Sequence, residues 1–127
     1  RIFNWDADGE YWAHRQIVEP NDEIFGAVFG QCIAMEGNTL LVGSQWGGEG
    51  TEKSGVIYHF KRTDGLWTKI SVIPNKDYVA GDADRFGCPL ALSGDSIVVG
   101  ARGDSTLGPF GGSAFIYDIC PAGDYLI

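Results

Sequence analysis

A repeat with a period of 57 residues limits, more than any other feature, what this chain can fold into. Residues 86–117 restate residues 29–60: Phe-Gly, an apolar segment, a Gly-Asp or Gly-Asn turn, an apolar triplet followed by Gly, a Gly-rich loop and a second apolar run. A regular period of this kind is typical of folds built from stacked supersecondary units. The two copies align without a gap, and the offset is the same at three pairs of residues: Phe29 and Phe86, Gly43 and Gly100, Gly55 and Gly112.

Each copy consists of short apolar segments separated by turn residues, which favours β-strands. Gly37-Asn38 is a two-residue turn that requires positive φ at both positions, and Asp64-Gly65 is a second hairpin signal. The sequence therefore predicts an all-β fold made of antiparallel four-stranded blades of a β-propeller. In the first complete copy the expected strands are residues 31–35, 39–43, 55–60 and 67–72.

The repeat also divides the chain into parts. Asp8-Gly9 lies between aromatic and apolar runs, so residues 1–18 are expected to form a hairpin equivalent to the second half of a unit. Two and a fraction blades do not close a ring, because propellers have about four to eight. We therefore expect a segment of a longer propeller or an assembly of several copies. The predicted parts are the C-terminal half of a preceding blade (1–24), a complete blade (25–84), the first three strands of the next blade (85–119), and the start of a Cys-rich segment or tail (120–127).

The composition argues against two classes of partner. Nine Lys and Arg residues against 17 Asp and Glu give a net charge of −8, which would repel nucleic acid or an anionic membrane surface. No apolar run approaches the roughly 20 residues that a membrane-spanning helix needs, so no membrane insertion is expected. Because the chain begins at Arg1 rather than Met, we expect that a leader was removed or that the chain is part of a longer polypeptide.

The repeated motif resembles the FG-GAP repeats of integrin-like β-propellers. The resemblance covers nearly the whole chain, and its motifs in the second copy are Phe86-Gly87, Gly94-Asp95, Gly100-Ala101 and the run Gly-Ser-Ala-Phe-Ile-Tyr at 112–117. It implies an extracellular protein of adhesion or recognition. Many members carry a calcium loop between the first two strands of a blade. Here the corresponding residues 36–39 and 93–96 are too few to surround a cation that takes about six to eight oxygens, so no cofactor is expected.

A recognition surface, if present, is expected where two sets of loops emerge on the same side of a four-stranded meander. These are the loop between its second and third strands and the connection to the next blade; we refer to this side as the loop face. Trp46 stands there in a Gly-rich loop and could stack on a sugar, anchor a protein or fold back over the blade. Arg102-Gly103-Asp104 spells an integrin-binding tripeptide, although the resemblance to FG-GAP repeats, which routinely carry Gly-Asp at this place, implies that the match is a coincidence. The candidate ligand-binding residues are Trp46, Glu49, Asp82, Asp84, Arg85, Arg102, Asp104 and Phe110.

No catalytic constellation stands out. The acidic residues are scattered in turns rather than paired as glycoside hydrolysis requires, and His14 and His59 lie on expected strands. We therefore predict a non-enzymatic recognition or adhesion module that binds protein or glycan. The alternative is a structural building block of a larger cell-surface or filament assembly, whose partners are propeller blades of the same or of neighbouring chains.

The three cysteines leave at least one sulfur without an internal partner. Cys32 lies three residues after Phe29 and Cys88 two residues after Phe86, so on strands of period two they face opposite ways. We interpret them as two buried thiols. The segment that begins at Cys120, Cys-Pro-Ala-Gly-Asp-Tyr, resembles the start of ephrin-receptor-like Cys-rich modules. That resemblance implies an oxidised Cys120 and an extracellular or cell-surface location.

Overall fold

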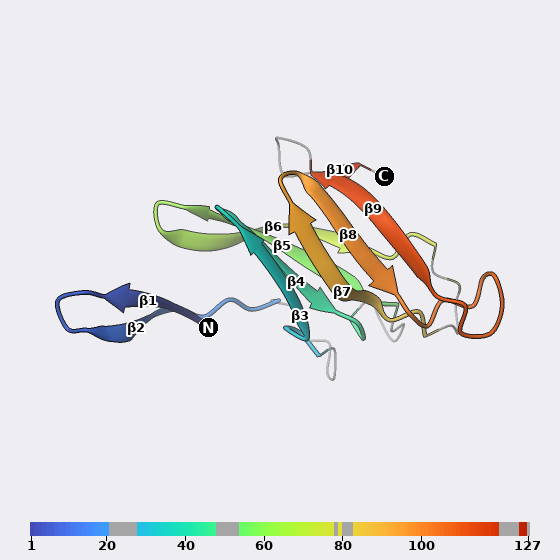
Figure 1. Cartoon of the computed structure of the whole chain (residues 1–127), viewed down its shortest axis with the longest axis horizontal. Coiled ribbons are helices and arrows are strands. Elements are labelled where there is room, and N and C mark those ends of the chain that lie inside the picture. The colour runs from blue at the N-terminus through green and yellow to red at the C-terminus, as the bar shows by residue number, and fades with distance from the viewer. Residues whose placement is uncertain (21–27, 48–53, 78, 80–82, 120–124, 127) are drawn as a thin grey trace.

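The structure is a computed structural model that describes residues 1–20, 28–47, 54–77, 79, 83–119 and 125–126. All regular structure in these residues is β-strand, arranged in three antiparallel sheets (Figure 1). The strands are β1 (Ile2–Asp6), β2 (Tyr11–Gln16), β3 (Cys32–Glu36), β4 (Thr39–Ser44), β5 (Val56–Thr63), β6 (Leu66–Pro74), β7 (Phe86–Ser93), β8 (Ser96–Ala101), β9 (Ser113–Ile119) and β10 (Tyr125–Leu126).

The two copies of the repeat form two four-stranded meanders, which confirms the predicted fold class. The order β3-β4-β5-β6 makes the first blade, and β10-β9-β8-β7 makes the second. Three strands were expected in the second blade, followed by a Cys-rich segment or tail. The structure adds β10, in which Tyr125 pairs with Ile119 and Leu126 with Asp118.

Residues 2–16 form the predicted hairpin, β1 with β2, as a separate two-stranded sheet. Trp5 and Trp12 are paired across it, with ring centroids 5.5 Å apart in an edge-to-face arrangement. The side chain of Gln16 ties the hairpin to the first blade: it accepts a hydrogen bond from Trp67 N at 2.8 Å and donates one to Trp67 O at 2.6 Å. The hairpin therefore holds the main chain of β6, although its origin as half of a preceding blade stays a prediction.

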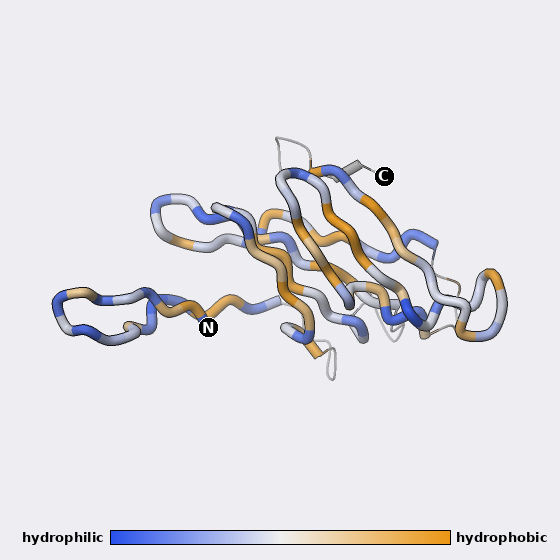
Figure 2. Tube along the Cα trace, in the orientation of Figure 1, coloured by the Kyte–Doolittle hydropathy of each residue, from blue (hydrophilic) through white to orange (hydrophobic). Residues whose placement is uncertain are grey.

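The two blades pack face to face, and this contact is the main core of the described chain. We call the side of each blade that is turned toward higher residue numbers its trailing face, and the opposite side its leading face. The trailing face of the first blade packs against the leading face of the second, and strands of both blades are largely apolar (Figure 2). The fully buried members of this core are Leu41, Ile57 and Ile73 from the first blade and Phe86, Ile97, Val99, Ala101 and Tyr117 from the second.

A second cluster covers the leading face of the first blade. Its buried members include Tyr58, Phe60 and Trp67, and side chains that lie before β3 in the sequence, Val18 and Phe29, pack against it. Phe29 makes edge-to-face contacts with Tyr58 and Phe60 at 5.3 and 6.3 Å between ring centroids.

The Phe-Gly dipeptide of the repeat is the point of closest approach between the blades. A Cβ on Gly43 would lie 2.0 Å from Gly87 O, and a Cβ on Gly55 would lie 2.1 Å from Phe86 O. Both contacts would be with main chain, which has little freedom to move away. Glycine is therefore required at these two positions, because only a residue without Cβ lets the next blade come this close.

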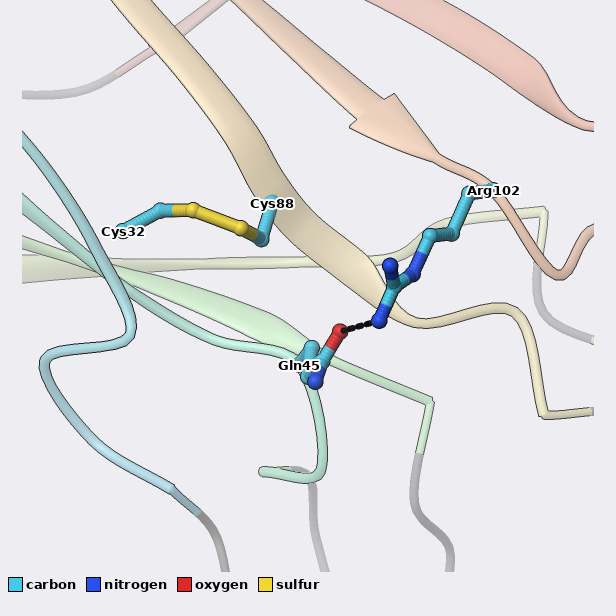
Figure 3. The surroundings of a disulfide bond; sticks show 4 residues. All are labelled: Cys32, Gln45, Cys88 and Arg102. Carbon is cyan, nitrogen blue, oxygen red and sulfur yellow. Dashed lines mark hydrogen bonds between the residues drawn. A yellow bond between two sulfur atoms is a disulfide. The ribbon is translucent and has the colours of Figure 1, made fainter.

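Cys32 and Cys88 form a disulfide, with their Cα atoms 5.5 Å apart, so the interpretation of two buried thiols is wrong (Figure 3). The sequence predicts that Cys32 and Cys88 point to opposite faces of equivalent strands, and this opposite orientation is what allows the bond. Cys32 lies on the trailing side of the first blade and Cys88 on the side of the second blade that meets it. Opposite faces of stacked blades are the ones in contact, and the innermost strands β3 and β7 lie side by side.

Candidate functional site

The loop face is formed where the loop between β8 and β9 contacts the connection between β6 and β7. Gly103 N donates a hydrogen bond to Asp84 O at 2.9 Å. A Cβ on Gly103 would lie 2.0 Å from Ala83 O, so the two segments are in tight main-chain contact. Candidate residues from both segments therefore lie close together.

Two contacts join the blades on this face. The guanidinium of Arg85 lies 5.1 Å from the centroid of the Trp46 ring, a cation–π geometry. Arg102 donates a hydrogen bond to the side chain of Gln45 at 3.3 Å (Figure 3). Trp46 is half-buried, and its ring lies against Arg85, the residue before the second blade, an arrangement that the sequence did not predict.

Asp84 and Asp104 are buried and hold the loops in shape. Asp84 Oδ2 accepts a hydrogen bond from Asn75 Nδ2 at 2.7 Å. The carboxylate of Asp104 accepts hydrogen bonds from Thr106 N, at 2.8 Å, and from the Ser113 hydroxyl. With 3% and 6% exposure they are not displayed on the surface. The acid of the Arg-Gly-Asp tripeptide is thus engaged inside its own loop.

Lowering the pH is expected to weaken the loop around Asp104. The hydrogen bonds from Ser113 and then from Thr106 lower the pKa of Asp104 below its ordinary value, while desolvation opposes them. A carboxyl group whose pKa is lower in the folded chain stabilises the fold above its unfolded pKa, and this contribution is lost as the pH falls through the folded value. The stability advantage of the wild type over Asp104→Asn should therefore be largest near pH 7 and shrink below about pH 4. Urea unfolding of both proteins across this range measures the difference, and a constant difference would contradict the assignment.

Two apolar side chains of the loop face are highly exposed. Phe110 is 83% exposed and Leu107 is 91% exposed, both on the loop between β8 and β9. This loop is braced from within by hydrogen bonds from Gly112 N to Asp104 O at 2.8 Å and from Gly111 N to Gly108 O at 3.0 Å. An open hollow of about 520 Å³ lies beside it, lined in part by Val79, Leu107 and Phe115. A braced loop with an aromatic and an aliphatic tip is suited to contact a partner.

Sequence reasoning missed Leu107, Gln45 and Asn75. Leu107 shares the Gly-rich loop of Phe110, and the same argument from an apolar residue among small ones would have found it. Gln45 lies at the position equivalent to Arg102 in the repeat, and this equivalence does not reveal that the two side chains meet. Glu49 and Asp82 lie outside the described residues, and ligand binding by all of the candidates stays a prediction.

Over the residues that the structure describes, no group of three or more His, Cys, Asp and Glu side chains is arranged to hold a metal ion. Within the same residues there is no helix long and apolar enough to cross a membrane.

Comparison with known protein families finds the FG-GAP repeat, whose family model matches residues 12–60 and 67–117. The matched segments cover most of the chain and end before residues 120–127, where nothing supports the expected Cys-rich module. No curated protein and no solved structure matches the chain.

Proposed function

The chain belongs to the FG-GAP repeat family, and from this premise we propose that it is a non-enzymatic extracellular or cell-surface recognition module that binds protein or glycan through its loop face. The observation that carries the proposal is the exposure of Phe110 and Leu107 on a loop that internal hydrogen bonds hold in place. A large apolar side chain on a braced loop loses little conformational freedom on binding, which favours affinity.

The surroundings support contact with either class of partner. An aromatic ring stacks on the apolar face of a sugar and also anchors protein interfaces, where aromatic and arginine side chains are enriched. Arg102 is exposed beside this loop, and its guanidinium could pair with an anionic group of the partner. The disulfide between Cys32 and Cys88 supports a secreted or extracellular location, because such bonds persist in oxidising compartments.

Replacing Phe110 with alanine is expected to raise the Kd for the partner at least 10-fold, because the variant loses an aromatic anchor of the interface. This change equals a loss of more than about 1.4 kcal/mol of binding free energy. The assay is binding of the purified chain to an array of neutral, sialylated and sulfated glycans and to a panel of purified extracellular proteins. Leu66→Ala is the matched control, because Leu66 is 60% exposed at the turn between β5 and β6, at the other end of the blade. Absence of binding to both panels, or equal losses in the two variants, would overturn the proposal.

A further inference from the structure

The trailing face of the second blade is an apolar surface whose counterpart in the first blade is covered. Leu41 is fully buried, whereas the equivalent Val98 is 44% exposed. His59 is 3% exposed, whereas the equivalent Ile116 is 66% exposed. The exposed apolar residues of this face are Pro89, Ala91, Val98, Ala114 and Ile116, and the exposed Ser93, Ser96 and Asp118 make its end at the turn between β7 and β8 polar. The trailing face of the second blade is therefore an exposed surface of the same kind as the trailing face of the first blade, which the second blade covers.

In the described residues, no Phe-Gly dipeptide packs on this face at the position that Phe86-Gly87 takes on the first blade. Gly55 has φ +92° and, with a Cβ, would collide with the main chain of Phe86. The equivalent Gly112 also has positive φ, +72°, but the nearest described atoms to its Cβ position are Arg102 Cα and O, both at 3.7 Å. The main chain at Gly112 thus has a positive φ like that at Gly55 in the first blade. No described residue packs on it as Phe86-Gly87 packs on Gly55.

The leading face of the first blade carries a dipeptide of the required kind. Phe29 contacts Tyr58 and Phe60 edge to face, as Phe86 contacts the equivalent Phe115 and Tyr117. Gly30 has φ +90°, near the +106° of Gly87, and no atom of the described residues lies within 4 Å of its Cβ position. The dipeptide is therefore in the conformation of the packed one but has no blade in front of it in the described structure.

The inner strand beside this dipeptide is also uncovered. Ile33 and Met35 are both 65% exposed, whereas the equivalent Leu90 and Leu92 are partly buried against the core between the blades. Ile2 and Val18 pack on part of the leading face and leave these two side chains open.

We propose that a second copy of this chain binds head to tail, with its Phe29-Gly30 segment against Gly112 and its Ile33 and Met35 over the apolar face of Val98 and Ile116. The occupant follows from complementarity that the chain already realises once, between its own two blades. This interface uses none of the apolar loop tips of the proposed recognition site, so either proposal stands without the other. Because the positions equivalent to Cys32 and Cys88 hold Pro89 and Gln31, this contact is non-covalent and reversible on dilution.

A head-to-tail interface joins two different surfaces, so it continues from copy to copy until a ring closes or a filament grows. This property gives a sharp test with two variants. Ile116→Asp damages only the trailing face and Met35→Asp only the leading face; both side chains are exposed, so neither change buries a charge in the single chain. Leu66→Asp is the control, because Leu66 is 60% exposed at the turn between β5 and β6 and takes no part in the proposed contact.

Molar mass is measured by light scattering over a range of concentrations. We expect the mass of the wild type and of the control to rise with concentration, and each face variant alone to remain at the 13.7 kDa of one chain. An equal mixture of the two variants should form dimers and nothing larger, because each dimer has one intact interface and two damaged ends. Circular dichroism of each variant, and mass spectrometry that detects the Cys32–Cys88 disulfide, verify that the variant is folded. If Ile116→Asp or Met35→Asp fails this check, Ile116→Ser or Met35→Ser takes its place.

Three results would overturn the proposal. The wild type could stay monomeric at the highest concentration, both face variants could associate like the wild type, or one variant alone could dimerise. A monomeric wild type would mean that these faces do not bind a second copy. Association of both variants would place the contact on another surface, and dimerisation of one variant alone would indicate a two-fold interface.

Discussion

Replacing Gly55 with alanine is expected to lower the free energy of unfolding by roughly 3–5 kcal/mol. The added Cβ would lie 2.1 Å from Phe86 O and 2.6 Å from Phe86 N, and both atoms belong to the main chain. The blades would have to separate locally, which opens the core around Phe86. The φ of +92° adds backbone strain, because alanine rarely adopts it. Urea unfolding of the purified variant measures the loss.

Gly30→Ala is the matched control for this change. Gly30 has almost the same φ, +90°, and within the part of the chain that the structure describes no atom lies within 4 Å of its Cβ position, so the control carries the backbone strain without the collision. Its expected cost is about 1–2 kcal/mol. Both variants are measured at a concentration low enough to exclude self-association. If they lose the same stability, the close approach of the two blades does not contribute as proposed.

The strands could be predicted because the signals for them are local. Asp64-Gly65 marks a turn through the conformation of two residues, and the apolar run on either side marks its strands through a period of two. The structure places this turn between β5 and β6. The 57-residue repeat supports each element twice, since the turn at Gly37 is repeated at Gly94, and both glycines have positive φ. The expectation of positive φ at Asn38 as well is wrong, because only the glycine of this turn takes it.

The contacts between blades could not be predicted in the same way, because they depend on how the sheets stack. The sequence shows that Gly43 and Gly55 recur, and only the stacked structure shows that Phe86-Gly87 lies against both. The loop face has the same limit. Sequence locates Asp104 in a Gly-rich loop, but the hydrogen bonds that engage its carboxylate come from Thr106 and Ser113, which the loop brings together only once folded.

Removing the Cys32–Cys88 disulfide is expected to lower the free energy of unfolding by about 4 kcal/mol. The bond links residues 56 positions apart, so without it the unfolded chain gains the conformational entropy of a long loop. The measurement compares the oxidised wild type with Cys32→Ala/Cys88→Ala in urea. Both proteins carry Cys120→Ser, which prevents thiol exchange during unfolding. Equal stability of the two proteins, or free thiols at both positions in the oxidised protein, would contradict the assignment.

The place of the bond determines where its loss should act first. It joins β3 to β7, the strands at which the two blades meet, and it adds nothing to the hydrogen-bonded ladders within either blade. Hydrogen exchange in the double variant should therefore quicken most at Gly87 and the neighbouring residues of β7, where the blades are held together. Amides in the pairing of β4 with β5, which is internal to the first blade, should lose less protection. Uniform loss over both blades would instead mean that the two blades unfold as one unit with or without the bond.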